Sequence, residues 1–170
     1  MARIPLITDR EGLVPEARAA FDRIVESRGE LLRPFQVLLH VPAAAARVAE
    51  LGHALRFGSG LEDRDRELVT LATGRARGCA YVWDSHVEAG IEAGVRPEAI
   101  AALEGEEGGL DEREEALVAF VDELCRTGAV TDRTFAAVHD LLGTSGTVEL
   151  AVVVGYYTML GLAMSACEAC

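Results

Sequence analysis

The chain is poor in the residues that mark sheet-rich and nucleic-acid-binding proteins. Aromatic residues make up only 5% of its 170 positions, and runs of β-branched residues are few, which favours helices. Lys and Arg together number 16 against 28 Asp and Glu, for a formal net charge of −12. Because such a surface repels phosphates, we expect neither nucleic acids nor anionic membranes as partners.

Cysteine is also scarce, and its scarcity bears on the cellular compartment. The four cysteines, Cys79, Cys125, Cys167 and Cys170, are too few and too scattered for a disulfide framework. The N-terminus lacks the basic and then apolar pattern of a secretory signal. These absences predict a cytoplasmic protein in a reducing environment.

Helical periodicity runs through almost the whole chain. Half of the residues are hydrophobic, apolar positions recur three and four apart, and proline and glycine mark the ends of the repeats. Helices are predicted over 15–29, in a short stretch from 34, over 43–58, 61–78, 79–94, 97–103, 111–128 and 132–143 with Thr131 as cap, and from Thr144 or Thr147 onward. This pattern predicts a single all-α domain of about eight helices over 1–170, in which 1–30 form an arm and the first helix and 104–112 form a surface loop.

One segment is long enough to span a membrane. Residues 150–167 carry no charge between Glu149 and Glu168, which meets a minimal length criterion. The segment holds several small or weakly polar residues, and no Lys or Arg flanks it, unlike a typical span. We therefore predict a buried helix, in the core or in a subunit interface, and no membrane association.

The stretch GCAYVWDSHVEAG gathers reactive side chains on one predicted helix. Cys79, Val82 and His86 are three and four positions apart and so lie on one face, with Tyr81 and Trp83 on either side. A helix N-terminus favours the thiolate of a nearby cysteine, and a histidine accepts or supplies protons. The plainer alternative is a small buried cysteine and a core histidine.

Glu67 extends this stretch to a longer pattern, Glu67-x11-Cys79-x2-Val82-x3-His86. The pattern resembles the Glu-x11-Cys-x2-Cys-x3-His motif of the carboxymuconolactone decarboxylase and alkylhydroperoxidase D superfamily. The resemblance continues in RPFQVLLHVP, LEDRDRELVTLA and TVELAVVVGYYTMLG, and it covers most of residues 30–165. It implies an all-helical bundle of the alkylhydroperoxidase D type that assembles as trimers or hexamers, with sites near subunit contacts.

The resemblance also assigns roles to the motif. In the peroxidase branch of the superfamily, the second cysteine attacks the peroxide and the first resolves the sulfenic acid. Cys79 matches the resolving cysteine, and Glu67 and His86 match the proton-relay pair. Val82 stands in the attacking position, and a valine cannot be a nucleophile. The chain therefore resembles the decarboxylase-like branch, which does not need the dithiol and releases CO₂ from a carboxylated lactone.

This branch implies a cofactor-free acid–base enzyme that acts on a small carboxylated or lactone substrate. His86 would supply the proton or anchor the anion. Glu67 would be the acid, or it would orient the histidine ring. In the plainer alternative, Glu67 only forms a salt bridge with Arg64 or Arg75. Cys79 stays a candidate catalytic residue with an open redox role.

The substrate pocket is predicted beside these residues. Tyr81 and Trp83 would form an apolar wall, to which Tyr81 could add a hydroxyl donor, and Val82 lies on the same face. His40 lies in a segment that resembles the family, and we expect it to line the pocket. The histidines His40, His53 and His139 lack metal-ligand spacing with one another or with Cys79, so we expect neither a metal nor another cofactor.

Two other functions stay open at this point. The chain ends in CEAC, so Cys167 and Cys170 could serve as partners of Cys79 in a thiol-dependent antioxidant of the alkylhydroperoxidase or peroxiredoxin type. A terminal pair outside the family motif is more often incidental. The chain could also be a non-catalytic ligand-binding or assembly protein, because function belongs to the site rather than to the fold.

Overall fold

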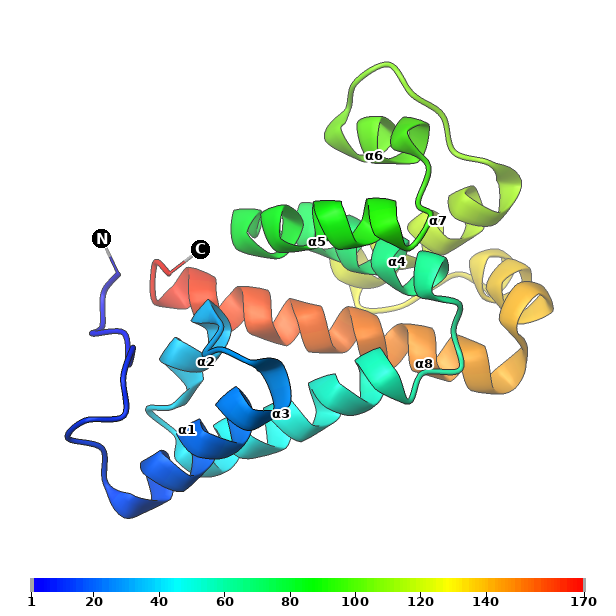
Figure 1. The fold of residues 1–170 in the computed structure, drawn as a ribbon. Coiled ribbons are helices and arrows are strands. Elements are labelled where there is room, and N and C mark those ends of the chain that lie inside the picture. The colour runs from blue at the N-terminus through cyan, green and yellow to red at the C-terminus, as the bar shows by residue number, and fades with distance from the viewer. Residues whose placement is uncertain (1, 170) are drawn as a thin grey trace. The chain divides into compact units, whose positions relative to one another are not determined.

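The computed structural model describes residues 2–169, and every regular element within them is a helix (Figure 1). The helices are α1 (Pro15–Arg28), α2 (Arg33–Leu38), α3 (Pro42–Phe57), α4 (Asp63–Ala76), α5 (Ala80–Glu92), α6 (Pro97–Glu104), α7 (Glu112–Thr127) and α8 (Asp132–Ala166). Most predicted ends lie within two residues of these bounds, the usual uncertainty of a helix end. The predicted all-α fold of about eight helices is confirmed.

Proline and glycine set most of the helix ends. Four helices, α1, α2, α3 and α6, carry proline in the first two helical positions, where its missing N–H is not needed. Gly29, Gly105 and Gly128 follow the ends of α1, α6 and α7 with φ values of 80°, 82° and 77°, which only glycine adopts without strain. The sequence signals therefore act locally, as the prediction assumed.

Helix α8 is two helices that meet at Gly143. This glycine has φ 66° and ψ −176°, which is not helical, and it is the point where the sequence predicted one helix to end and another to begin. The predicted cap at Thr131 is confirmed, because its hydroxyl accepts the N–H of Thr134 at 3.3 Å. The hydroxyl of Thr147 instead donates to the Gly143 carbonyl at 2.7 Å, one turn back, so the predicted cap at this residue is wrong.

The chain forms two compact units. The first holds the residues up to Ser59 together with Leu162–Ala169. In it α1 and α2 pack against α3, around a core that contains Ala20, Ile24, Phe35, Leu39 and Ala45. Whether the whole chain is one domain, as the sequence predicts, stays a prediction.

The second unit, Gly60–Gly161, is built around α4. Helix α4 packs against α5, α6 and α7, and all of its residues from Asp65 to Gly74 are buried. A helix surrounded in this way places its polar side chains inside the unit, where each needs a partner. Glu67 is one of them, and this burial positions it for the site described below.

The apolar helix α8 passes a test for membrane spans by length and composition alone. Its most apolar window of 18 residues has a mean hydropathy of 1.5, and 44% of that window is buried. The buried positions include Leu150, Val153 and Met164, each fully enclosed. A soluble core helix has the same properties, and this is the helix that the sequence predicts.

Candidate functional site

The structure brings Glu67 and His86 into direct contact. Glu67 lies in the buried run of α4 and is 5% exposed, whereas His86 lies on α5 with 15% of its side chain exposed. His86 Nδ1 is 2.7 Å from Glu67 Oε2. An ionised carboxylate only accepts hydrogen bonds, so Nδ1–H of the histidine donates. The pair that the motif predicts is therefore present as a hydrogen-bonded unit.

Two glycines allow α4 and α5 to approach closely around this pair. A Cβ atom at Gly74 of α4 would stand 3.0 Å from Val82 Cγ1 and 3.2 Å from the backbone nitrogen of Trp83. A Cβ atom at Gly90 of α5 would stand 3.1 Å from Leu71 Cδ1. All three distances are shorter than normal contacts between non-bonded heavy atoms. The missing side chains thus set the spacing of the two helices that carry Glu67 and His86.

Arg66 is the arginine that pairs with Glu67. Its Nη2 lies 3.5 Å from Glu67 Oε1, and its Nη1 lies 2.6 Å from Asp63 Oδ1. The partners predicted from the sequence, Arg64 or Arg75, are not among the ion pairs recorded for Glu67. Arg64 binds Asp111 and Glu114, and Arg75 lines a pocket near Cys79. Arginine side chains are long and flexible, so their positions on a helix do not settle their partners.

Tyr157 of α8 packs against His86, a contact that was not predicted from the sequence. The two rings meet edge to face with their centroids 5.0 Å apart, and Tyr156 packs against Tyr157 in the same manner at 5.2 Å. Two adjacent tyrosines in an otherwise aliphatic run were the available signal. Because Tyr157 is 71 positions from His86, no helical spacing could connect them.

In this arrangement, Nε2 is the ring nitrogen of His86 that is available for proton transfer. No hydrogen bond to this atom is recorded among residues 2–169, while Nδ1 is engaged by Glu67. A histidine with one nitrogen held by a carboxylate is fixed in ring orientation and in tautomer, and its other nitrogen can accept or deliver a proton. This geometry fits the second predicted role of Glu67, which orients the ring.

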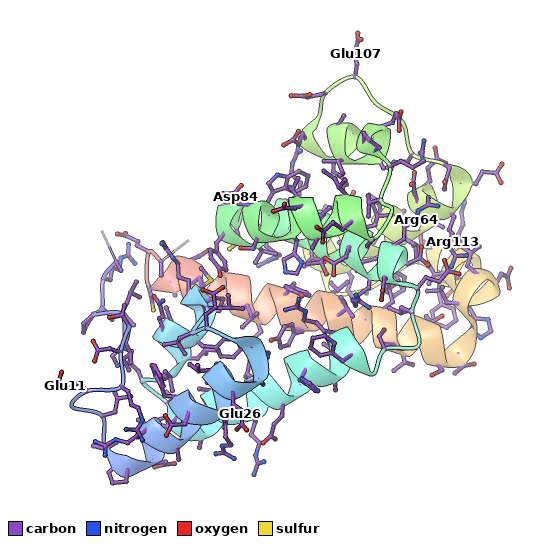
Figure 2. All side chains as sticks on the ribbon, in the orientation of Figure 1. Glu11, Glu26, Arg64, Asp84, Glu107 and Arg113 are labelled. Atoms are coloured by element: carbon purple, nitrogen blue, oxygen red, sulfur yellow. The ribbon has the colours of Figure 1, made fainter. Side chains whose placement is uncertain are left out.

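Cys79 lies at the beginning of α5, as its N-cap, and is 1% exposed. It borders a pocket of about 510 Å³ at the junction of α4, α5 and α6. The pocket is lined by Gly74, Arg75, Gly78, Cys79, Ala80, Trp83, Asp84, Glu104 and Glu106. Figure 2 shows Asp84 pointing away from α5. Neither Glu67 nor His86 lines this pocket, so Cys79 and the acid–base pair face different surroundings.

The predicted wall residues divide between core and pocket. Val82 is 3% exposed and packs against Gly74, whereas Trp83 lines the pocket beside Cys79. Tyr81 is half-buried and lines none of the described pockets. Of the two residues predicted to form an apolar wall, Trp83 lines this pocket and Tyr81 does not.

Two residues that the sequence predicts to take part in the site, His40 and Cys167, lie outside the second unit. His40 is exposed in the first unit, where its Nε2 is 2.7 Å from the carbonyl oxygen of Pro5. Cys167 is a free, half-buried cysteine of the same unit, and Cys170 lies outside the described residues. The redox pairing proposed for the terminal cysteines stays a prediction. The remaining thiol, Cys125, has a pKa raised by burial.

A second buried carboxylate, Glu114, lies in the same unit at the beginning of α7. It is 1% exposed and accepts hydrogen bonds from Arg64 Nη2 at 2.6 Å, from two nitrogens of Arg96 and from the backbone N–H of Asp111 at 2.9 Å. Arg64 and Arg113 are labelled in Figure 2, near the beginnings of α4 and α7. This cluster joins α4 to α7 and to the residues that precede α6.

Burial and hydrogen bonding act on Glu114 in opposite directions. Burial, the largest single effect, raises the pKa of Glu114, but the hydrogen bonds from Arg96, from the backbone at Asp111 and from Arg64 together lower it below its ordinary value.

No group of three or more His, Cys, Asp or Glu side chains in the described part of the chain is arranged to hold a metal ion.

Known structures share this helical arrangement. A peroxidase-related protein with an alkylhydroperoxidase AhpD core from Ralstonia eutropha superposes with a TM-score of 0.79 at 18% identity, over 99% of this chain and 91% of that one. A cysteine-to-alanine variant of the debrominase Bmp8 in complex with 2,3,4-tribromopyrrole gives a TM-score of 0.77 at 16% identity, over 99% and 92%. A protein of unknown function from Agrobacterium tumefaciens, for which an AhpD-type antioxidant defence role is proposed, gives 0.68 at 24%, over 78% and 93%.

These likenesses define the class of the fold, which is the all-α fold of alkylhydroperoxidase D. Residues 42–107, which contain Glu67, Cys79 and His86, match the carboxymuconolactone decarboxylase family. This match covers less than half of the chain, and together with the fold it relates the chain to the carboxymuconolactone decarboxylase and alkylhydroperoxidase D-like proteins. No curated protein matches the chain.

Proposed function

We propose that the protein is a cofactor-free acid–base enzyme of the decarboxylase-like branch, acting on a small carboxylated or lactone substrate. The observation that carries this proposal is the buried contact of 2.7 Å between His86 Nδ1 and Glu67 Oε2. Val82 occupies the position where the peroxidase branch has its attacking cysteine. The acid–base pair is thus the part of the motif that this chain retains in full.

The proposed reaction uses the free nitrogen of His86. The bond between the substrate carbon and its carboxylate breaks, CO₂ leaves, and the electron pair stays on the substrate as a dienolate. Nε2 of a protonated His86 then delivers its proton to that carbon. Glu67, held against Nδ1, stabilises the imidazolium and fixes the direction of Nε2. The product leaves with one carboxylate fewer and one C–H bond more.

Carboxymuconolactone is the first probe, because the family that matches residues 42–107 is named for its decarboxylation. We expect the protein to release CO₂ from it or from a related small lactone acid, and His86→Ala to abolish this release. Cys79→Ser should reduce the rate by less than about tenfold, because the thiol borders a pocket that neither Glu67 nor His86 lines. If His86→Ala turns over as fast as the unaltered protein, the acid–base function is wrong.

A thiol-dependent activity is the second candidate, and one observation favours it. Cys79 borders a pocket of about 510 Å³ at the N-terminus of α5, where the helix dipole favours a thiolate. The debrominase and the peroxidase-related protein share this fold, which makes a thiol-dependent activity worth testing. Turnover of cumene hydroperoxide with dithiothreitol as reductant, lost in Cys79→Ser and kept in His86→Ala, would support this candidate over the first.

Assembly and location complete the proposal. We expect a cytoplasmic homo-oligomer, a trimer or hexamer, that binds a small molecule and neither nucleic acid nor membrane. Light scattering coupled to size-exclusion chromatography measures the oligomeric state directly. Binding of carboxymuconolactone without turnover, together with no hydroperoxide activity, would instead support a ligand-binding or assembly protein.

A further inference from the structure

Arg66 is a strongly buried arginine that contacts the acid–base pair. Only 11% of its side chain is exposed. Its Nη2 lies 3.5 Å from Glu67 Oε1, on the oxygen that His86 does not use. Burying a guanidinium is costly unless it is paired. An arginine with an exposed side chain would not bear this cost of burial. The burial of Arg66 therefore indicates a role other than keeping the protein soluble.

The other end of the guanidinium is anchored as well. Nη1 of Arg66 lies 2.6 Å from Oδ1 of Asp63, one turn earlier on α4, and the Asp63 side chain is 74% exposed. The Nε atom of Arg66 is buried and has no hydrogen-bond partner recorded within the described residues. Arg66 is thus held through its two terminal nitrogens, one on Asp63 and one on Glu67. These contacts form a continuous chain from Asp63 through Arg66 and Glu67 to His86.

We propose that Arg66 is a positioning residue of the His86 site: it holds Oε1 of Glu67, so that Oε2 is left to fix the Nδ1–H tautomer and the ring orientation of His86. A carboxylate with a single partner can rotate and exchange its oxygens. A carboxylate held on both oxygens presents one of them in a constant direction. A guanidinium beside a carboxylate also stabilises its ionised form, which can only accept the histidine proton.

This inference rests on the proposed function for its catalytic meaning but can be tested without substrate. The protein has four histidines, and long-range ¹H–¹⁵N spectra distinguish the Nδ1–H and Nε2–H tautomers of each ring. His86→Ala assigns the His86 signals. Glu67→Ala gives the spectrum of a histidine that has lost its carboxylate, and so sets the full size of the effect.

Arg66→Met removes the charge and keeps an apolar stem of similar length. We expect it to shift His86 at least half of the way toward the Glu67→Ala spectrum and to lower turnover at least about tenfold, the loss typical when a group that orients a functional histidine is removed. Arg66→Lys keeps the charge and should restore most of the Nδ1–H tautomer. Arg47→Ala removes an equal charge from an exposed pair with Glu50 and should leave His86 unchanged.

An unchanged His86 spectrum in folded Arg66→Met overturns the proposal. If Arg66→Met does not fold, Asp63→Ala replaces it, since this exposed position tolerates the change and alanine offers Nη1 of Arg66 no acceptor. An unchanged spectrum in Asp63→Ala then overturns the proposal instead. The two proposals fail separately. A tautomer shift with turnover that survives His86→Ala rejects the function only, and His86-dependent turnover with no tautomer shift rejects the role of Arg66 only.

Discussion

Glu67 and Glu114 are two buried glutamates of the same compact unit, and they are held in different ways. Glu114 accepts from two arginines and a backbone N–H, so both of its oxygens are fully occupied by donors. Glu67 has one arginine at 3.5 Å and a histidine at 2.7 Å. The two glutamates differ in the kind of side chain that binds them. Arginine stays charged at all ordinary pH values, whereas histidine can gain or lose its proton.

The comparison separates two kinds of buried carboxylate. The arginines of Glu114 stay protonated at ordinary pH, so that cluster joins α4 to α7 without taking up or releasing protons. The histidine that binds Glu67 has a second ring nitrogen, to which the proposed function assigns the proton transfer. Similar burial therefore does not imply a similar role, and the predictions below test each side of the comparison.

The largest effect is expected at His86. His86→Ala should reduce turnover of the active probe by about 10²- to 10⁴-fold, the usual contribution of general acid–base catalysis. Steady-state kinetics measures this loss. Glu114→Gln, assayed while folded, should stay within a few-fold of the unaltered protein, since Glu114 does not contact the pair. Equal losses in the two variants would erase the distinction between them.

The second effect concerns stability and is expected at Glu114. Glu114→Gln removes the buried carboxylate between Arg64 and Arg96, which keep the more exposed Asp111 as a partner and about a third of their side chains in solvent. We expect a loss on the order of 2–3 kcal/mol in the free energy of unfolding, somewhat below the loss for a wholly buried pair. Urea titration followed by circular dichroism provides the measurement. A loss below about 0.5 kcal/mol would mean that the cluster contributes little.

A third effect tests the close approach of α4 and α5. Gly74→Ala should destabilise the protein by about 1–2 kcal/mol, because overpacking costs more than the better helix propensity of alanine returns. It should also weaken turnover, since α5 carries His86. Gly155→Ala is the matched control. A Cβ atom at this exposed glycine of α8 meets nothing within 4 Å, so the variant should gain up to about 1 kcal/mol. Thermal unfolding of the two variants compares them directly.

The smallest effect is a pH dependence of stability. The pKa of Glu114 is lower in the folded protein than its ordinary value of 4.5, so the folded state binds this proton less readily. The resulting stabilisation is fully present above pH 4.5 and is lost as the pH falls through the folded pKa. Between pH 7 and pH 3, Glu114→Gln should therefore lose less stability than the unaltered protein. Parallel urea titrations across this range would reveal identical slopes if Glu114 contributed nothing.

Local signals made the fold predictable. Proline at helix starts and glycine at helix ends act within one turn, so their positions gave the bounds of α1, α3 and α7 closely. The break at Gly143 was predictable for the same reason. The Thr147 cap was not, because its hydroxyl had a choice between the following backbone and the preceding turn, and only the packed helix settles that choice.

The site was predictable only in part. Helical spacing and the motif bring out Glu67 and His86, but their hydrogen bond depends on how closely α4 and α5 pack. Arg64 binds Asp111 and Glu114, whereas Arg66 forms the ion pair with Glu67, and only the packing of α7 against α4 decides this division. The contact with Tyr157 joins distant parts of the chain. The separation of the Cys79 pocket from His86 also follows from packing, so residues on one predicted stripe need not share a cavity.

Gly74 and Val82 together limit how this sequence can change. The space that a side chain at Gly74 would need is already taken by Val82 Cγ1, at 3.0 Å. A larger residue at position 74 therefore requires a smaller one at position 82, so the two positions are expected to covary among relatives. Neither residue takes part in the hydrogen bond between Glu67 and His86. A single substitution at position 82 would thus change which side chain the motif presents while the two partners of that hydrogen bond stay the same.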